Sequence, residues 1–285
     1  MHVEYLFELL EENPLLTLAD ELYIKHRINV VAQTIRNSLD AMCYTIKQTH
    51  KQPADIKAER VKIRRKEYIL KIMKAQADGK HVIFFDETGY NLCCARNRGW
   101  SRRGTRAVHV RDISRGQSLN VICAISEDGV EYVKYLFGST KADTVAEFVR
   151  RLLREVVTKI SLFDVVIVCD NASVHNSVTQ VIEEPEFVGV EAIPLSPYSP
   201  MLKPIENTFS VFKSAVQTYL AEHCQEILTV PSGTTKTKHR AAWLRRATEY
   251  SMSAKVTSDL CPKLCRHSQR FYIPALAMAD MPIGA

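Results

Sequence analysis

The first 46 residues carry apolar positions at helical spacing, so three short helices are expected there. The apolar stripe of the third helix consists of Val31, Ile35, Leu39 and Met42. Its outward polar residues are Gln33, Arg36 and Asn37. Three small helices with a polar, arginine-bearing last one fit a helix-turn-helix unit that reads DNA. The same pattern fits a plain three-helix packing unit equally well.

A linker and a basic helix are expected next. Residues 47–56 have the composition of a linker, and a helix over roughly 57–77 follows. The expected buried side of that helix consists of Val61, Tyr68, Ile69 and Ile72. Asp78 and Gly79 form a turn signal that ends it.

From residue 81 onward, strand patterns alternate with helix patterns. Strands are expected at 81–86, 118–125, 130–137, 163–169 and 190–193, and helices at 142–157, from about 174 and from 204. This order predicts an α/β fold with one mixed sheet covered by helices on both faces. The chain is thus expected to comprise a helix-turn-helix-like unit (1–50), a basic linker and helix (51–80), an α/β domain (81–220) and a helical C-terminal extension (221–285).

Composition narrows the class of protein. The chain has 285 residues, of which 46% are hydrophobic and 25% charged, as in soluble globular proteins. We expect no membrane-spanning segment, because the longest apolar runs are only strand-sized, and no secretory signal, because the N-terminus is acidic and amphipathic. The eight cysteines have no regular spacing and are expected to be reduced. A net charge of +6 is compatible with a nucleic-acid partner, although many basic proteins bind none.

Basic residues gather in two stretches, 57–66 and 96–115. Either stretch alone is as easily a solvated surface. Two of them flanking an acidic site favour contact with the phosphate backbone of DNA. The candidates for that contact are Arg64, Arg65, Arg102 and Arg103.

Three acidic residues stand at chemically informative places. Asp86 and Asp170 each follow an apolar strand, and neighbouring strands would bring both to the same edge of a sheet. Glu206 lies in the first turn of a helix, just after Pro204, with its carboxylate away from the buried stripe. Taken singly, each acid is more often a helix cap or a surface charge.

Together the three acids make a plausible metal centre. Oxygen ligands without histidine or cysteine suit Mg²⁺ or Mn²⁺ rather than zinc. Two such ions, about 4 Å apart, can activate the attacking oxygen and stabilise the leaving oxygen in phosphodiester displacement. The expected cofactor is therefore a pair of divalent ions, with no small-molecule cofactor.

Four motifs, in order, resemble the catalytic domain of Tc1/mariner superfamily transposases, which are DDE endonucleases. They are FFDETGY (84–90), GWSRRGTRA (99–107), VIVCDNASVH (166–175) and SPYSPMLKPIENTFSVFK (196–213). The resemblance implies an RNase H-like fold with Asp86, Asp170 and Glu206 as the catalytic triad. It also implies cut-and-paste transposition of double-stranded DNA: hydrolysis at transposon ends, then attack by the freed 3′-hydroxyl on target DNA, usually at TA. Pairing two ends implies at least a homodimer.

Several other residues are weaker candidates. Asn171 and His175 are expected either to orient a metal ligand or contact DNA, or to cap a helix; Lys213 is expected near phosphate. Cys261, Cys265 and His267 lack a fourth ligand and the usual spacing, so zinc is not expected.

The sequence departs from the family pattern in two regions. The N-terminal region resembles the second of two helix-turn-helix units, in a shortened form, which leaves recognition of transposon ends in doubt. Lys203 stands where the family usually has asparagine before the Pro-x-acid motif. It could pair with DNA phosphate or compete with metal by charge.

These observations leave three hypotheses: a transposase, a catalytically inactive DNA-binding protein derived from one, or an RNase H-like nuclease that cuts without joining. The short basic run at 62–66 could direct nuclear import in a eukaryotic host, whereas a bacterial protein would act in the cytoplasm or nucleoid.

Overall fold

The computed structural model describes residues 18–41, 54–91, 117–170 and 176–281. The chain divides into two compact units, Met1–Pro53 and Ala54–Ala285.

In the first unit, two described helices are joined by a short connection. The helices are α2 (Leu18–His26) and α3 (Ala32–Ala41), and Arg27 between them has a positive φ of 57°. Ile35 is buried, as its place on the apolar stripe predicts. The prediction for Val31 is wrong: the helix begins after it, and its side chain is 69% exposed.

The polar residues of α3 face solvent. Gln33, Arg36 and Asn37 are exposed, and the Gln33 side-chain amide donates a 2.8 Å hydrogen bond to Asn37 Oδ1. This bond joins residues four apart, which are neighbours on a helix surface. The three residues therefore form one exposed polar face.

The second unit is built on a five-stranded sheet in the order β3-β2-β1-β4-β5. The strands are β1 (His81–Tyr90), β2 (Leu119–Ser126), β3 (Gly129–Phe137), β4 (Val165–Cys169) and β5 (Glu191–Pro194). The first three form an antiparallel meander, whereas β4 is parallel to β1 and β5 is parallel to β4. The sheet is mixed, as the order of elements predicts.

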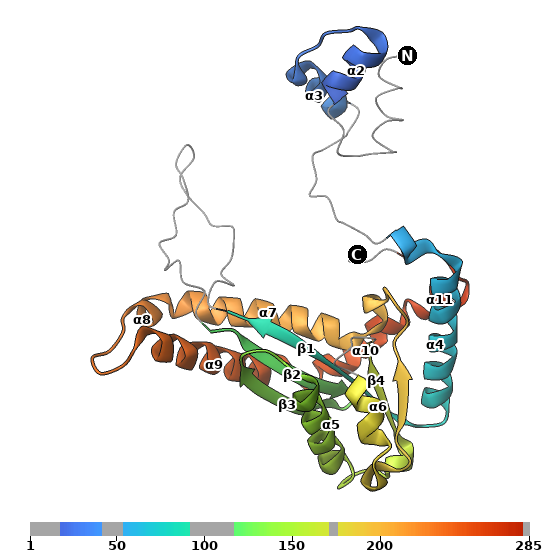
Figure 1. The fold of residues 1–285 in the computed structure, drawn as a ribbon, viewed down its shortest axis with the longest axis vertical. Coiled ribbons are helices and arrows are strands. Elements are labelled where there is room, and N and C mark those ends of the chain that lie inside the picture. Colours follow the sequence, from blue (N-terminus) through green and yellow to red (C-terminus); the bar gives the residue numbers. More distant parts are fainter. Residues whose placement is uncertain (1–17, 42–53, 92–116, 171–175, 282–285) are drawn as a thin grey trace. The chain divides into compact units, whose positions relative to one another are not determined.

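Helices cover both faces of this sheet (Figure 1). The helices are α4 (Glu59–Ala77), α5 (Ala142–Val156), α6 (Asn176–Ile182), α7 (Pro204–Glu222), α8 (Cys224–Leu228), α9 (Lys236–Lys255), α10 (Leu260–Gln269) and α11 (Tyr272–Leu276). Short 3-10 turns lie at η1 (Ala54–Lys57), η2 (Leu162–Asp164), η4 (Pro185–Phe187) and η5 (Pro200–Leu202). In the described part of the chain, no helix is long and apolar enough to cross a membrane.

Alternation along β1 sorts the core into two layers. Ile83 and Phe85 pack with α5 and α6, while Val82 and Phe84 pack with α4, α7 and the C-terminal helices. Successive side chains of a strand point to opposite faces, so one central strand supplies both layers. The side chains of its even-numbered residues therefore point toward α7.

The C-terminal helices belong to the same core as the sheet. Leu244 of α9 and Cys261 of α10 are buried in the layer that contains Val82 and Phe84. The expected division after residue 220 falls inside α7, which runs on to Glu222. The C-terminal helices α9, α10 and α11 thus complete one face of the sheet.

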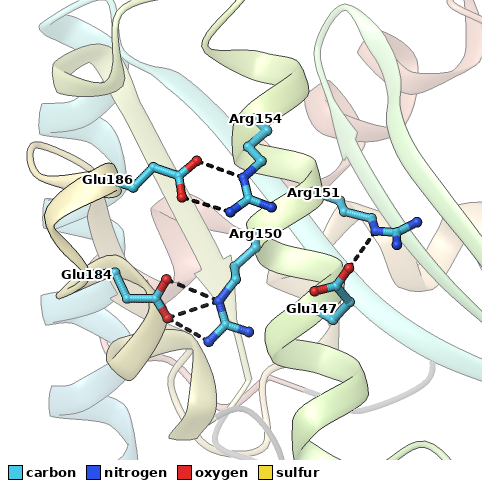
Figure 2. A network of polar contacts seen from close by, with 6 residues as sticks. All are labelled: Glu147, Arg150, Arg151, Arg154, Glu184 and Glu186. Carbon is cyan, nitrogen blue, oxygen red and sulfur yellow. Dashed lines mark hydrogen bonds and ion pairs between the residues drawn. The ribbon is translucent and has the colours of Figure 1, made fainter.

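On the opposite face, arginines of α5 hold the segment that follows α6. Arg150 Nη2 lies 2.6 Å from Glu184 Oε1, and Arg154 binds Glu186 through two hydrogen bonds of 2.7 and 2.8 Å (Figure 2). Arg151 pairs with Glu147 within α5 and takes no part in this link. The paired arginines orient the turn that leads into β5.

Candidate active site

Asp86 and Asp170 lie at corresponding positions and on the same face of two neighbouring strands. The parallel register pairs Phe84 with Val168, and each aspartate follows two residues later. Phe84 and Val168 both pack in the layer covered by α7, and the two-residue period of a strand directs Asp86 to that side as well. Asp170 continues the same register just past the end of β4.

The strand that carries Asp86 is longer than the sequence predicts. β1 does not end at Asp86 but continues to Tyr90, because Asp86 through Tyr90 pair with β2. Asp86 is consequently buried in the sheet, and its Oδ1 accepts a 2.8 Å hydrogen bond from the backbone N–H of Glu87. The carboxylate stands on a rigid strand rather than on a loop.

Glu206 comes from the helix that lies over this face. It occupies the first turn of α7, whose buried stripe consists of Pro204, Ile205, Thr208, Phe209, Phe212, Val216 and Leu220. The stripe predicted from the sequence (Ile205, Phe209, Phe212 and Val216) is confirmed. Glu206 itself is exposed, on a different face of the helix.

The electrostatics couple Glu206 to both aspartates. Desolvation by surrounding protein raises the pKa of Glu206, and the negative charges of Asp86 and Asp170 raise it further, while Lys203 and Lys213 act in the opposite direction. Although solvent reaches Glu206, the field of both aspartates acts on its carboxyl group. Like charges that disfavour one another in this way create a site that favours a cation.

Lys203 supplies a positive charge at this site. Its side chain is 1% exposed, and its Nζ lies 2.9 Å from Asp86 Oδ2 and 3.9 Å from Asp170 Oδ2. The same charge acts on Cys169, where burial is the larger influence and raises the thiol pKa to about 11. Lys203 thus stands among the acidic residues rather than at the surface.

A short loop delivers Lys203, and α4 holds that loop. Arg65 Nε donates a 3.0 Å hydrogen bond to Ser199 Oγ, and the Tyr68 hydroxyl lies 3.5 Å from the Leu202 carbonyl oxygen. The Ser199 hydroxyl also lies 2.7 Å from that of Ser196. Arg65 of α4 and the two serines of the loop therefore fix the turn that precedes α7.

The predicted DNA-contacting residues fall into different environments. Arg64 and Lys213 are exposed, as contact with DNA requires. The prediction that Arg65 is a surface contact is wrong, because its side chain is 1% exposed and bonded to Ser199. Lys203 is likewise buried. Arg102, Arg103, Asn171 and His175 lie outside the described residues.

The burial of Arg65 had a signal in the sequence. Residues 61, 65, 68 and 72 fall on one helical stripe, and the other three are the predicted apolar residues Val61, Tyr68 and Ile72. Helical spacing therefore placed Arg65 on the inner face of α4, and its charge alone suggested the surface.

Two other groups of potential metal ligands differ in how their side chains are arranged. Cys261 and Cys265 are buried in the core, whereas His267 is exposed on the same helix. His81 Nε2 lies 2.8 Å from Glu131 Oε1 and its Nδ1 lies 3.5 Å from Asp128 Oδ2. This second cluster lies at the start of β1, and the imidazole bridges the two acids.

The residues around Asp86 fit a hard divalent cation. Asp86, Asp170 and Glu206 provide oxygen donors, which Mg²⁺ and Mn²⁺ prefer. A positive group, the Lys203 ammonium, already lies within 4 Å of both aspartates. Within the described residues, the three carboxylates do not all lie within 4.8 Å of one another, whereas the ligand atoms of His81, Asp128 and Glu131 do.

The mixed sheet in this order, with helices on both faces, defines an RNase H-like fold. Solved structures of a mariner transposase share it. The pre-cleavage Mos1 transpososome aligns with a TM-score of 0.64 and 18% identity, covering 99% of this chain and 79% of that one. The Mos1 strand transfer complex aligns with a TM-score of 0.62 and 20% identity over 99% and 79% of the two chains. The Mos1 mariner paired end complex with Mn aligns with a TM-score of 0.63 and 19% identity, covering 96% of this chain and 78% of that one.

The family follows from the sequence of the α/β domain. Residues 81–228, more than half of the chain, match the family of DDE superfamily endonucleases, and the chain belongs to that family. No curated protein matches the chain. The matched region begins with β1 and contains Asp86, Asp170 and Glu206.

Proposed function

We propose that the chain is a Tc1/mariner-type transposase that cleaves double-stranded DNA and joins the freed end to a target. The observation that carries the proposal is the placement of Asp86 and Asp170 side by side on the face over which α7 brings Glu206. Membership of the DDE endonuclease family and the fold shared with Mos1 support it.

In this proposal, Asp86, Asp170 and Glu206 hold Mg²⁺ or Mn²⁺. A bound pair of ions would activate the attacking oxygen and stabilise the leaving oxygen of a phosphodiester. Asp86 would supply the fixed ligand, because it is buried in a central strand and held by the Glu87 N–H. Glu206 and Asp170, which are more open to solvent, would adjust around the ions.

Exposed basic and polar residues would hold the DNA. Arg64 on α4 and Lys213 on α7 would contact phosphates, which gives salt-dependent binding without sequence preference. Gln33, Arg36 and Asn37 on α3 would read base edges as the recognition helix of a helix-turn-helix unit.

The acting species would be a homodimer that brings two transposon ends together. One of the similar Mos1 structures is a paired end complex, and another is a transpososome. Light scattering of this chain with and without a DNA duplex tests this part: a mass that stays at one chain per complex on DNA contradicts it.

Cleavage of supercoiled plasmid in the presence of Mn²⁺ or Mg²⁺ tests the catalytic assignment. Asp170→Asn should lower the cleavage rate by about 100-fold or more, because it removes a charged ligand at the reacting phosphate. Asp164→Asn is the matched control. Asp164 is an exposed acid before β4 that pairs with Lys80 at 3.4 Å, and its loss should leave the rate within about twofold. Equal rates for wild type and Asp170→Asn would remove Asp170 from the catalytic site.

Joining needs its own assay. Incubation of a labelled duplex that has a free 3′-hydroxyl with target plasmid should give a covalent product at TA positions. A nuclease of the same fold would cut plasmid yet leave the label unjoined.

One observation favours a second candidate, a DNA-binding protein without catalysis. The ammonium of Lys203 already neutralises part of the charge of Asp86 and Asp170. Duplex binding in a gel-shift assay, combined with no cleavage by wild type with either metal ion, would select this candidate.

A further inference from the structure

The proposed cleavage reaction gives no role to Lys203, the buried lysine at the acidic site. Lys203 Nζ lies 2.9 Å from Asp86 Oδ2 and 3.9 Å from Asp170 Oδ2, and its side chain is 1% exposed. With the side chain in this place, protein covers it and DNA phosphate cannot reach it. Of the two roles open to this residue, contact with phosphate is therefore the less compatible with the structure.

The ammonium and a divalent ion would use the same oxygens. Mg²⁺ sits about 2.0–2.1 Å from its carboxylate oxygens. An ion at that distance from Asp86 Oδ2 would stand within a few ångströms of the ammonium, and like charges so close in a partly buried site repel strongly. Lysine offers no lone pair to a metal while it is protonated. The two cations are therefore alternatives.

We propose that Lys203 is a built-in competitor of the divalent ion, whose ammonium occupies the cation position between Asp86 and Asp170 until metal displaces it. The inference deepens the proposed function and rests on it in one respect, namely that the displacing ion is the ion used for DNA cleavage. The competitor makes metal binding weaker than three carboxylates alone would give.

The surrounding structure confines the exchange to the lysine side chain. The Lys203 backbone N–H donates to the Pro200 carbonyl oxygen at 3.0 Å, and its own carbonyl accepts from the Glu206 N–H at 3.1 Å. The hydrogen bond from Arg65 to Ser199 holds the preceding turn. The four-carbon stem of lysine can swing by rotation about its own bonds while the start of α7 stays in place.

The ammonium also balances part of the negative charge at the site, because it lies within 4 Å of both aspartates. Displacement of Lys203 would leave the negative charges unbalanced unless a metal ion took its place. Binding of the ion and departure of the lysine are therefore coupled.

Binding of Mn²⁺ to the full chain, measured by electron paramagnetic resonance of the free ion, tests the inference independently of activity. Lys203→Met removes the charge and keeps the length, and it should bind Mn²⁺ at least about tenfold more tightly than wild type, a change of about 1.4 kcal/mol. Lys203→Arg keeps the charge and should stay near wild type. Lys236→Met is the matched control: it removes an exposed charge at the start of α9, and should change the affinity less than about threefold.

The outcomes separate this inference from the proposed function. Equal or weaker Mn²⁺ binding by Lys203→Met overturns the competitor, and if wild type then cleaves DNA, the proposed function stands without it. Tighter binding by Lys203→Met, with no cleavage by any variant, supports the competitor and counts against the transposase. Absence of Mn²⁺ binding in both proteins overturns both.

If Lys203→Met does not fold, the inference can be tested on the wild-type protein by chemical labelling. Acylation of the Lys203 amine, followed by mass spectrometry, should be slow without metal and should rise as Mg²⁺ saturates the site, because the displaced amine leaves its buried place. Labelling that stays constant to saturation overturns the inference.

Discussion

Truncation of two neighbouring arginines of α4 should change two different properties of the protein. Arg64 is exposed, whereas the side chain of Arg65 is 1% exposed and donates to Ser199 Oγ at 3.0 Å. A second contact, from Arg65 Nη2 to the Tyr198 carbonyl oxygen, is 3.5 Å long and counts for little. Arg65→Ala should therefore destabilise the fold, and Arg64→Ala should weaken DNA binding.

The size of the stability change follows from these contacts. A hydrogen bond from a charged donor contributes about 1.5–3 kcal/mol, and the buried methylene groups lost beyond Cβ add about 1.6 kcal/mol. Desolvation of the guanidinium, which lowers the pKa of Arg65, offsets part of this sum. Ser199 keeps its contacts with Ser196 and Pro197, so no polar group is stranded. We expect Arg65→Ala to lower the free energy of unfolding by about 2–3 kcal/mol, and Arg64→Ala by less than about 0.5 kcal/mol.

Two assays check the pair. Urea denaturation followed by circular dichroism gives the free energy of unfolding, provided that the m-value stays unchanged. The salt dependence of binding to a duplex of arbitrary sequence counts phosphate contacts, and Arg64→Ala should reduce the slope of log K against log salt by about 0.9. The reasoning fails if Arg65→Ala unfolds at the wild-type urea concentration, or if it flattens the salt dependence as Arg64→Ala does.

Three further predictions concern the core and the titrating groups. Phe85→Ala should lower the free energy of unfolding, measured by urea denaturation, by about 3–5 kcal/mol, because Phe85 is fully buried and its ring centroid lies 6.0 Å from that of Phe148. A loss below about 1 kcal/mol would contradict this packing. Burial raises the pKa of Glu131, but hydrogen bonds from His81 and Ser126 outweigh this effect and leave the pKa below its ordinary value of 4.5. Glu131 therefore stabilises the fold above pH 4.5, and this stabilisation is lost as the pH falls further. Glu131→Gln should lower the free energy of unfolding at pH 7 by about 1–2 kcal/mol, with a gap that closes in acid; a gap independent of pH would refute the linkage. Burial raises the pKa of the Cys169 thiol to about 11. At pH 8, iodoacetamide should therefore alkylate Cys169 much more slowly than the less buried Cys224, as measured by mass spectrometry. Equal alkylation rates would count against the burial of Cys169.

Much of the fold could be predicted because its pattern is local. The apolar stripe of α7, the hairpin of β2 and β3, and the strand before Asp170 all follow from spacing within a few residues. The length of β1 could not be predicted in this way. The expected strand ended at Asp86, yet pairing with β2 extends it to Tyr90. Long-range pairing is invisible to local periodicity.

The sequence indicated candidate residues but not their contacts. The ends of two expected strands and the start of an expected helix pointed to Asp86, Asp170 and Glu206, because the topology of such a sheet brings these positions to one edge. The place of Lys203 depends on which way one flexible side chain turns at the start of α7, and no spacing encodes that. Arg65 is the opposite case, since helical spacing indicated the inner face of α4 and charge suggested the outer one.

The central position of β1 has a consequence for synthesis of the protein. β1 has β2 on one side and β4 on the other, and β4 leaves the ribosome only after β2, β3 and α5. Until then the growing chain presents an apolar strand with unpaired backbone groups along one edge, which invites pairing with other chains. We expect a nascent chain stalled before Val165 to aggregate or to require a chaperone, and release of the remaining residues to close that edge.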